Sequence, residues 1–61
     1  MTALDAYRTA RFLADDGRHD PDAVTHADMD TAADLAGANR PTNDNDRHSI
    51  RAAIDAIGGT R

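Results

Sequence analysis

Apolar and polar residues recur along the start of the chain with the period of an α-helix. One face of this segment carries Leu4, Tyr7, Ala10 and Ala14, and it is widened by Ala3, Ala6 and Leu13. Spacings of three and four residues bring side chains to the same side of a helix. Gly17 stands where a helix end favours a left-handed backbone. The pattern therefore predicts a helix over residues 3–15.

A second amphipathic segment follows a polar loop. In that loop Asp20 precedes Pro21, and the residue before a proline disfavours helix, so a short turn has its natural start at Pro21. Thr25 and Asp28 have the spacing of a capping box in which Asp replaces the usual Glu. The apolar face beyond them consists of Met29, Ala32, Ala33 and Ala36, with Leu35 at its edge. Because Gly37 suits a helix C-terminus, we predict a helix over residues 25–36.

The last helical segment follows a polar connection. Its apolar stripe consists of Ile50, Ile54 and Ile57, flanked by Ala53. Its opposite, solvated flank consists of Arg47, His48, Arg51 and Asp55. We predict this helix over residues 44–57, with Asp44 or Asp46 as its first residue. The glycine pair at positions 58 and 59 is expected to end it, and the last two residues form a tail.

Three helical segments without a strand of useful length predict an all-α fold, a small three-helix bundle forming one domain over residues 1–61. The core of this bundle is thin, because Leu, Ile, Val and Phe together supply only eight of the 61 residues. A domain of this size rarely gains more than ~3–5 kcal/mol from one core. We therefore expect marginal stability and a preference for a self-associated or partner-bound state.

Composition and charge exclude several classes of protein. Without cysteine there is no disulfide and no thiolate metal site. No apolar run approaches the ~18 residues that cross a bilayer, and the first residues do not resemble a signal peptide, so we expect a cytoplasmic protein that does not bind membranes. Residues 1–39 carry eight Asp and three Arg, whereas residues 40–61 carry four Arg and three Asp. Only the C-terminal part is therefore suited to a phosphate backbone.

Catalytic and metal-binding patterns are weak. His19, His26 and His48 lack the close spacing of zinc ligands. Residues 43–46, Asn-Asp-Asn-Asp, begin like a calcium loop but lack the glycine at its sixth position, which favours a helix N-cap instead. Ser49 adjoins His48, and adjacent side chains on a helix point in different directions. We predict no enzyme activity, no catalytic residue, no metal, no cofactor and no small-molecule substrate.

Three stretches carry a resemblance to a known class. They are Thr25-His26-Ala27-Asp28-Met29, the run from Ala33 through Gly37 to Thr42, and residues 46–59. Together they resemble the helix-turn-helix and winged-helix class of DNA-binding domains over residues 24–59. The resemblance implies a helix-turn-helix-like bundle whose last helix reads duplex DNA. Its candidate DNA-binding residues are Arg47, His48, Ser49 and Arg51 in the groove and Arg40 on a phosphate. The implied function is a dimeric DNA-binding regulator of transcription.

A second interpretation is a non-enzymatic protein–protein interaction module: an accessory subunit, an inhibitor or an acidic decoy, encoded by a virus or a host. It rests on the acidic N-terminal part, the thin core and Phe12, which lies off the apolar stripe of its helix. The residues assigned to the partner interface are Phe12, Tyr7 and Met29. A third interpretation is a self-assembling helical module, for which a homodimer is the simplest form.

Overall fold

Side-chain caps define where the first two helices begin. In a computed structural model that describes residues 1–59, helix α1 spans Ala3–Asp15, the short 3-10 helix η1 spans Pro21–Ala23, α2 spans His26–Ala36 and α3 spans Asp44–Gly59. The capping box predicted at Thr25 is confirmed: Thr25 Oγ1 accepts from the Asp28 amide, and the Asp28 carboxylate accepts from the Thr25 amide, both at 3.1 Å. Thr2 and Asp5 form a second capping box, at the start of α1. The all-α three-helix bundle predicted from the sequence is therefore confirmed.

Left-handed glycines follow the first two helices, as predicted. Gly37 has φ of 70° and caps α2, and Gly17 has φ of 83° one residue beyond the C-cap of α1. The glycine pair expected to end α3 does not do so, because α3 runs through Gly58 to Gly59. Gly58 does not have the positive φ that a left-handed cap requires. The tail expected at Thr60 and Arg61 lies outside the described residues.

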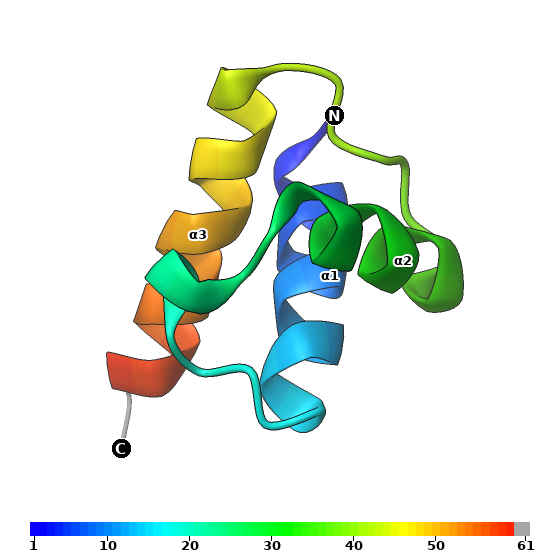
Figure 1. Cartoon of the computed structure of the whole chain (residues 1–61). Coiled ribbons are helices and arrows are strands. Elements are labelled where there is room, and N and C mark those ends of the chain that lie inside the picture. The colour runs from blue at the N-terminus through cyan, green and yellow to red at the C-terminus, as the bar shows by residue number, and fades with distance from the viewer. Residues whose placement is uncertain (60–61) are drawn as a thin grey trace.

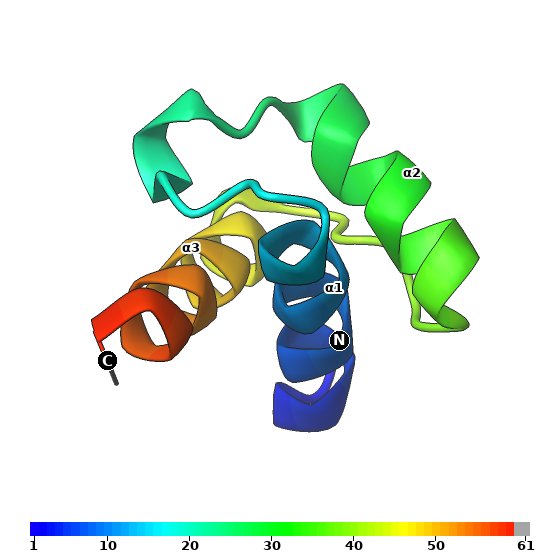
Figure 2. The same cartoon turned by 90° about the horizontal axis from the view of Figure 1, so that it is seen from below.

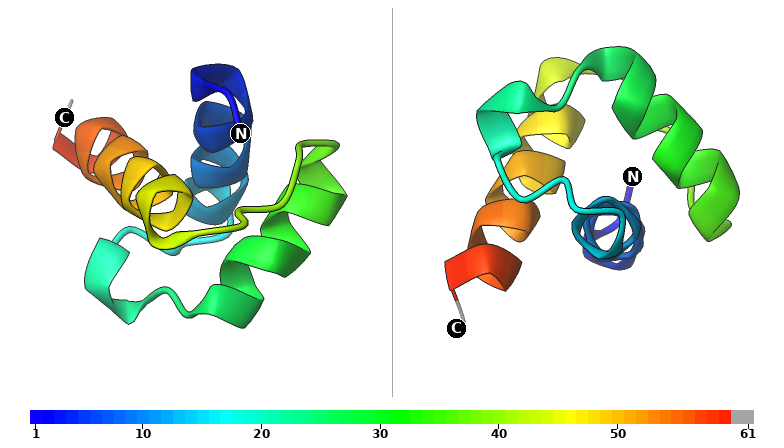
Figure 3. Two further views of the ribbon diagram at one scale, coloured as in Figure 1. Left: turned by 90° about the horizontal axis from the view of Figure 1, so that it is seen from above. Right: turned by 60° about the horizontal axis from the view of Figure 1, so that its bottom comes forward.

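Helix α1 lies at the centre of the bundle (Figure 1). Both α1 and α3 descend in Figure 1, whereas Figure 2 shows their axes inclined to each other; α2 crosses α1 on another side. Views from above and from below show α2 and α3 diverging, with η1 against α3 (Figure 3). Helices α2 and α3 therefore meet mainly through α1, and the connection over residues 37–43 separates them.

The core forms where α1 meets both other helices. Its buried apolar residues are Ala6, Ala10, Leu13, Val24, Met29, Ala32, Ile50 and Ile54. Thr9 is also fully buried, and its hydroxyl is satisfied because Oγ1 donates to the Asp5 carbonyl at 2.9 Å. Small residues on α1 and α2 let these helices approach closely, while Leu13, Met29 and the isoleucines of α3 supply most of the bulk.

The buried face of α1 differs from the predicted stripe. Leu4 and Tyr7 belong to the predicted apolar stripe, but they are 55% and 49% exposed. The face that packs is turned toward Ala6, Thr9 and Leu13, which also recur at helical spacing. This face packs because the smaller side chains allow two helices to approach α1 at once. Among residues 1–59 no helix has the length and apolar character needed to cross a bilayer.

Truncating Ile54 should unfold most of the protein. Its side chain is fully buried, and Ile→Ala in a core costs about 2–5 kcal/mol, comparable with the whole stability of a domain this small. We expect Ile54→Ala to lose most helical circular dichroism at 25 °C. Leu35→Ala, at a side chain 65% exposed, should change the free energy of unfolding by less than about 0.5 kcal/mol. Equal urea midpoints for the two variants would contradict the assignment of Ile54 to the core and of Leu35 to the surface.

Candidate functional site

The five residues predicted to bind DNA do not form a free basic surface. Arg40 is held by Asp34: Nε donates to Oδ1 at 2.8 Å, and Nη2 bonds Oδ2. These hydrogen bonds raise the pKa of Arg40 and lower the pKa of Asp34. The guanidinium is therefore already neutralised by a carboxylate with bidentate geometry.

Two further candidate DNA-binding residues on α3, Arg51 and Arg47, form hydrogen bonds within the protein. Arg51 donates from Nε to the Pro21 carbonyl at 3.3 Å and from Nη2 to the Val24 carbonyl at 3.4 Å, which ties η1 to α3. Arg47 donates from Nη1 to Asp44 at 3.0 Å, while its Nε is buried without a partner. Both guanidinium groups are therefore held by the protein's own oxygen atoms.

The other two candidate DNA-binding residues, Ser49 and His48, do not form a basic surface either. The Ser49 hydroxyl donates to the Asn45 carbonyl at 3.1 Å, so it caps the carbonyl one turn earlier. His48 is exposed, and its side chain makes no hydrogen bond or ion pair within residues 1–59. The start of α3 is therefore a neutral, internally bonded surface with one exposed histidine.

Two carboxylates, those of Asp5 and Asp46, are buried. Asp46 accepts from the Thr42 amide and hydroxyl, both at 3.0 Å, and from the α-ammonium of Met1 at 3.5 Å. The Thr42 amide is the largest cause of its lowered pKa. Asp46 therefore cannot repel phosphates from the tip of α3 as an exposed carboxylate would.

Asp5 joins two distant parts of the chain. Its carboxylate accepts from the Thr2 amide and hydroxyl at 3.0 Å and from the Asn39 amide and side chain at 3.3 and 3.2 Å. The Thr2 amide is the largest cause that lowers its pKa to about 2; partial burial opposes the shift, and Asn39 adds to it. The capping spacing of Thr2 and Asp5 was a signal available in the sequence, but the contact with Asn39 was not.

The three residues predicted to meet a partner occupy different places. Met29 is fully buried in the core, so it offers no surface in this fold. Phe12 is half-buried and packs against the core cluster from its edge. Tyr7 alone is substantially exposed, at 49%. Phe12 and Tyr7 differ in exposure because the buried face of α1 is rotated relative to the predicted apolar stripe, which turns Phe12 inward and Tyr7 outward.

The solvent-facing side of α1 combines apolar and basic groups. We call it the α1 outer face, formed by Leu4, Tyr7, Arg8 and Arg11. Arg11 lies 3.4 Å from Asp15 in an exposed pair. Among residues 1–59, Arg8 is the one arginine whose guanidinium makes no hydrogen bond or ion pair. A cation without an internal partner thus stands beside two half-exposed apolar side chains.

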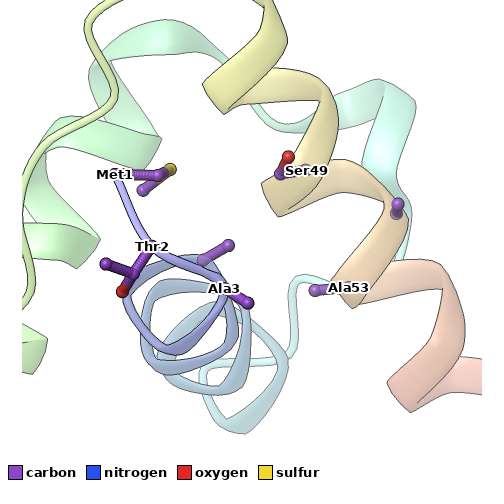
Figure 4. A pocket seen from close by; sticks show the side chains of 7 residues that line it. Met1, Thr2, Ala3, Ser49 and Ala53 are labelled. Carbon is purple, nitrogen blue, oxygen red and sulfur yellow. The ribbon is translucent and has the colours of Figure 1, made fainter.

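A shallow groove adjoins this face between the start of α1 and the middle of α3 (Figure 4). It measures about 400 Å³ and is lined by Met1, Thr2, Ala3, Ala6, Ser49, Ala52 and Ala53. Its two hydroxyls already donate, from Thr2 to Asp5 and from Ser49 to Asn45. None of the side chains that line it is titratable. Residues 1–59 contain no cluster of three histidine or carboxylate side chains that would hold a metal.

Acid should weaken the fold through Asp5. Its pKa is 3.8 when unperturbed and about 2 in the fold, so the unfolded chain binds a proton first. The stability that Asp5 contributes is therefore complete above about pH 4 and is lost as the pH falls toward 2. We expect Asp5→Asn to lower the urea midpoint at pH 7 and to reduce its fall between pH 4 and 2. Asp16→Asn, at an exposed carboxylate, is the control; equal pH profiles for wild type and Asp5→Asn would refute this role.

Comparisons of the chain with protein-family models, with characterised proteins and with solved structures give no match. The argument about function therefore starts from the surfaces described above. Of these, the α1 outer face is the one that combines exposed apolar area with an unpaired charge.

Proposed function

We propose that this protein is a non-enzymatic protein–protein interaction module that docks its partner through the α1 outer face. The observation that carries the proposal is Arg8, unpaired within residues 1–59, beside the half-exposed side chains of Leu4 and Tyr7. Tyr and Arg are enriched among residues that dominate binding energies at interfaces. Burying what remains exposed of Leu4 and Tyr7 would contribute about 1 kcal/mol each.

The charge of this face restricts the kind of partner. Arg8 needs a carboxylate from outside its own helix, because Asp15 already lies beside Arg11. An anionic side chain that meets Arg8 in a partly dry contact gains a charge-assisted hydrogen bond. The partner is therefore expected to present acidic groups around an apolar centre.

The DNA-binding interpretation has less support from the same geometry. Arg40, Arg47 and Arg51 each have partners inside the protein, and the net charge is −4. Binding phosphates would require breaking these contacts, and the acidic remainder of the surface would oppose approach.

Changing Tyr7 tests the proposal. Tagged protein, used to capture partners from its source cells and to capture a differently tagged second copy, should retain a binding protein. Tyr7→Glu should reduce that retention at least tenfold, about 1.4 kcal/mol, because it places a charge on the apolar centre. His48→Glu adds the same charge at an exposed position of α3 and should leave retention unchanged. Circular dichroism should show both variants folded.

Two outcomes would overturn this function. One is that no protein, including a second copy, is captured in a Tyr7-dependent way. The other is retention of duplex DNA at low salt that survives Tyr7→Glu, which would favour the helix-turn-helix interpretation.

A further inference from the structure

We infer that Asp16 is a site of spontaneous isoaspartate formation, which the turn at the end of α1 keeps closed in the folded protein and which opens when this turn unfolds. The inference is independent of the proposed function. It is carried by the hydrogen bonds that Gly17 and Arg18 make with α1 and by the exposure of the Asp16 side chain.

The sequence places one aspartate directly before a glycine. Of the eleven aspartates, Asp16 alone has this neighbour. In such a pair the amide nitrogen of Gly17 can attack the carboxyl carbon Cγ of Asp16. An N–Cγ bond forms, the nitrogen gives up its proton, and the carboxyl hydroxyl leaves with that proton as water. Water then adds to either carbonyl carbon of the cyclic imide, which opens to aspartate or to isoaspartate. Glycine favours the reaction because it has no Cβ to hinder its nitrogen.

The folded turn holds the two reacting atoms apart. The Gly17 amide donates to the Ala14 carbonyl at 3.0 Å. The Arg18 amide donates to the Leu13 carbonyl at 2.8 Å, which completes a Schellman motif. With ψ of 10° at Asp16, the Gly17 nitrogen nearly eclipses the Asp16 nitrogen and is turned away from the side chain. Ring closure requires a large rotation about the Cα–C bond of Asp16, and this rotation breaks both hydrogen bonds.

Opening of this turn therefore controls the reaction. Segments of a protein open locally at a lower cost than global unfolding, and slow chemistry in an opened segment follows the population of the open form. Opening here is opposed from α2 as well, because Arg18 Nη1 donates to the Asp28 carboxylate at 3.0 Å. The Asp16 side chain is exposed, so water already reaches it and the backbone is what restrains the reaction.

Isoaspartate cannot rebuild the same turn. The main chain then runs through the former side-chain carboxyl, which adds one methylene to the backbone and leaves the former main-chain carbonyl carbon as a free carboxylate. The amides of Gly17 and Arg18 are displaced from the carbonyls that they meet in the Schellman motif. The modified chain is therefore expected to be less stable, so a transient opening of the turn becomes a lasting one.

Ageing of the full chain at neutral pH tests the site. Trypsin releases residues 12–18, in which isoaspartate gives a separate chromatographic peak of unchanged mass. We expect isoaspartate at position 16 to form at least roughly tenfold more slowly in buffer than in urea above the unfolding midpoint. A synthetic peptide of residues 12–18 in buffer should match the rate in urea, which controls for effects of urea on the chemistry.

Asp16→Glu is the matched control, because it keeps the charge at an exposed position. Its longer side chain would have to close a six-membered ring, which forms far more slowly, so no isomerised peptide should appear. Equal rates in buffer and in urea would overturn the closure by the turn. Absence of isoaspartate at position 16 from the unfolded chain would overturn the site itself.

The purified isoaspartate form provides a second measurement. Its urea midpoint should lie below that of wild type, whereas Asp16→Glu should leave the midpoint close to the wild-type value. A midpoint equal to that of wild type would show that the modified turn still forms, and it would overturn the proposed loss of the cap.

Discussion

The carboxylate of Asp5 is the contact on which the arrangement of the bundle depends. It caps the first turn of α1 through Thr2 and holds the backbone and side chain of Asn39, just beyond α2. One buried side chain thus fixes where α1 begins and where the chain leaves α2. The same residue contributes to the acid sensitivity of the fold, because its hydrogen bonds stabilise the ionised form.

Central placement of α1 determines which of its residues remain outside. Two helices can pack on α1 only if the face between them is small, and Ala6, Thr9 and Ala10 provide that face. The bulkier Leu4 and Tyr7 are then turned to solvent. The exposed apolar area of the α1 outer face is therefore a consequence of how the core is built, and the thin core and the proposed docking surface have the same origin.

Most of the arginines likewise form contacts within the protein. Arg18 and Arg40 pair with carboxylates of α2, Arg47 pairs within the first turn of α3, and Arg51 bonds the carbonyls around η1. Charges that seemed available for nucleic acid are thus used to join segments of an acidic chain. Arg8 has no such partner among residues 1–59. The proposed partner is therefore inferred from the position of this one charge, and not from an excess of basic residues.

The sequence by itself determined the local elements: three helices close to their observed bounds, the cap at Thr25 and the glycine turns at Gly17 and Gly37. These features depend on residues within one or two turns of each other, so spacing suffices to predict them. Only the tertiary structure decided which face of α1 is buried, because Leu4–Tyr7 and Ala6–Leu13 have equally helical spacings and the choice depends on how closely two neighbours can pack. It also decided that Asp5 meets Asn39 and that Arg51 meets Pro21, contacts about thirty residues apart that no local pattern encodes.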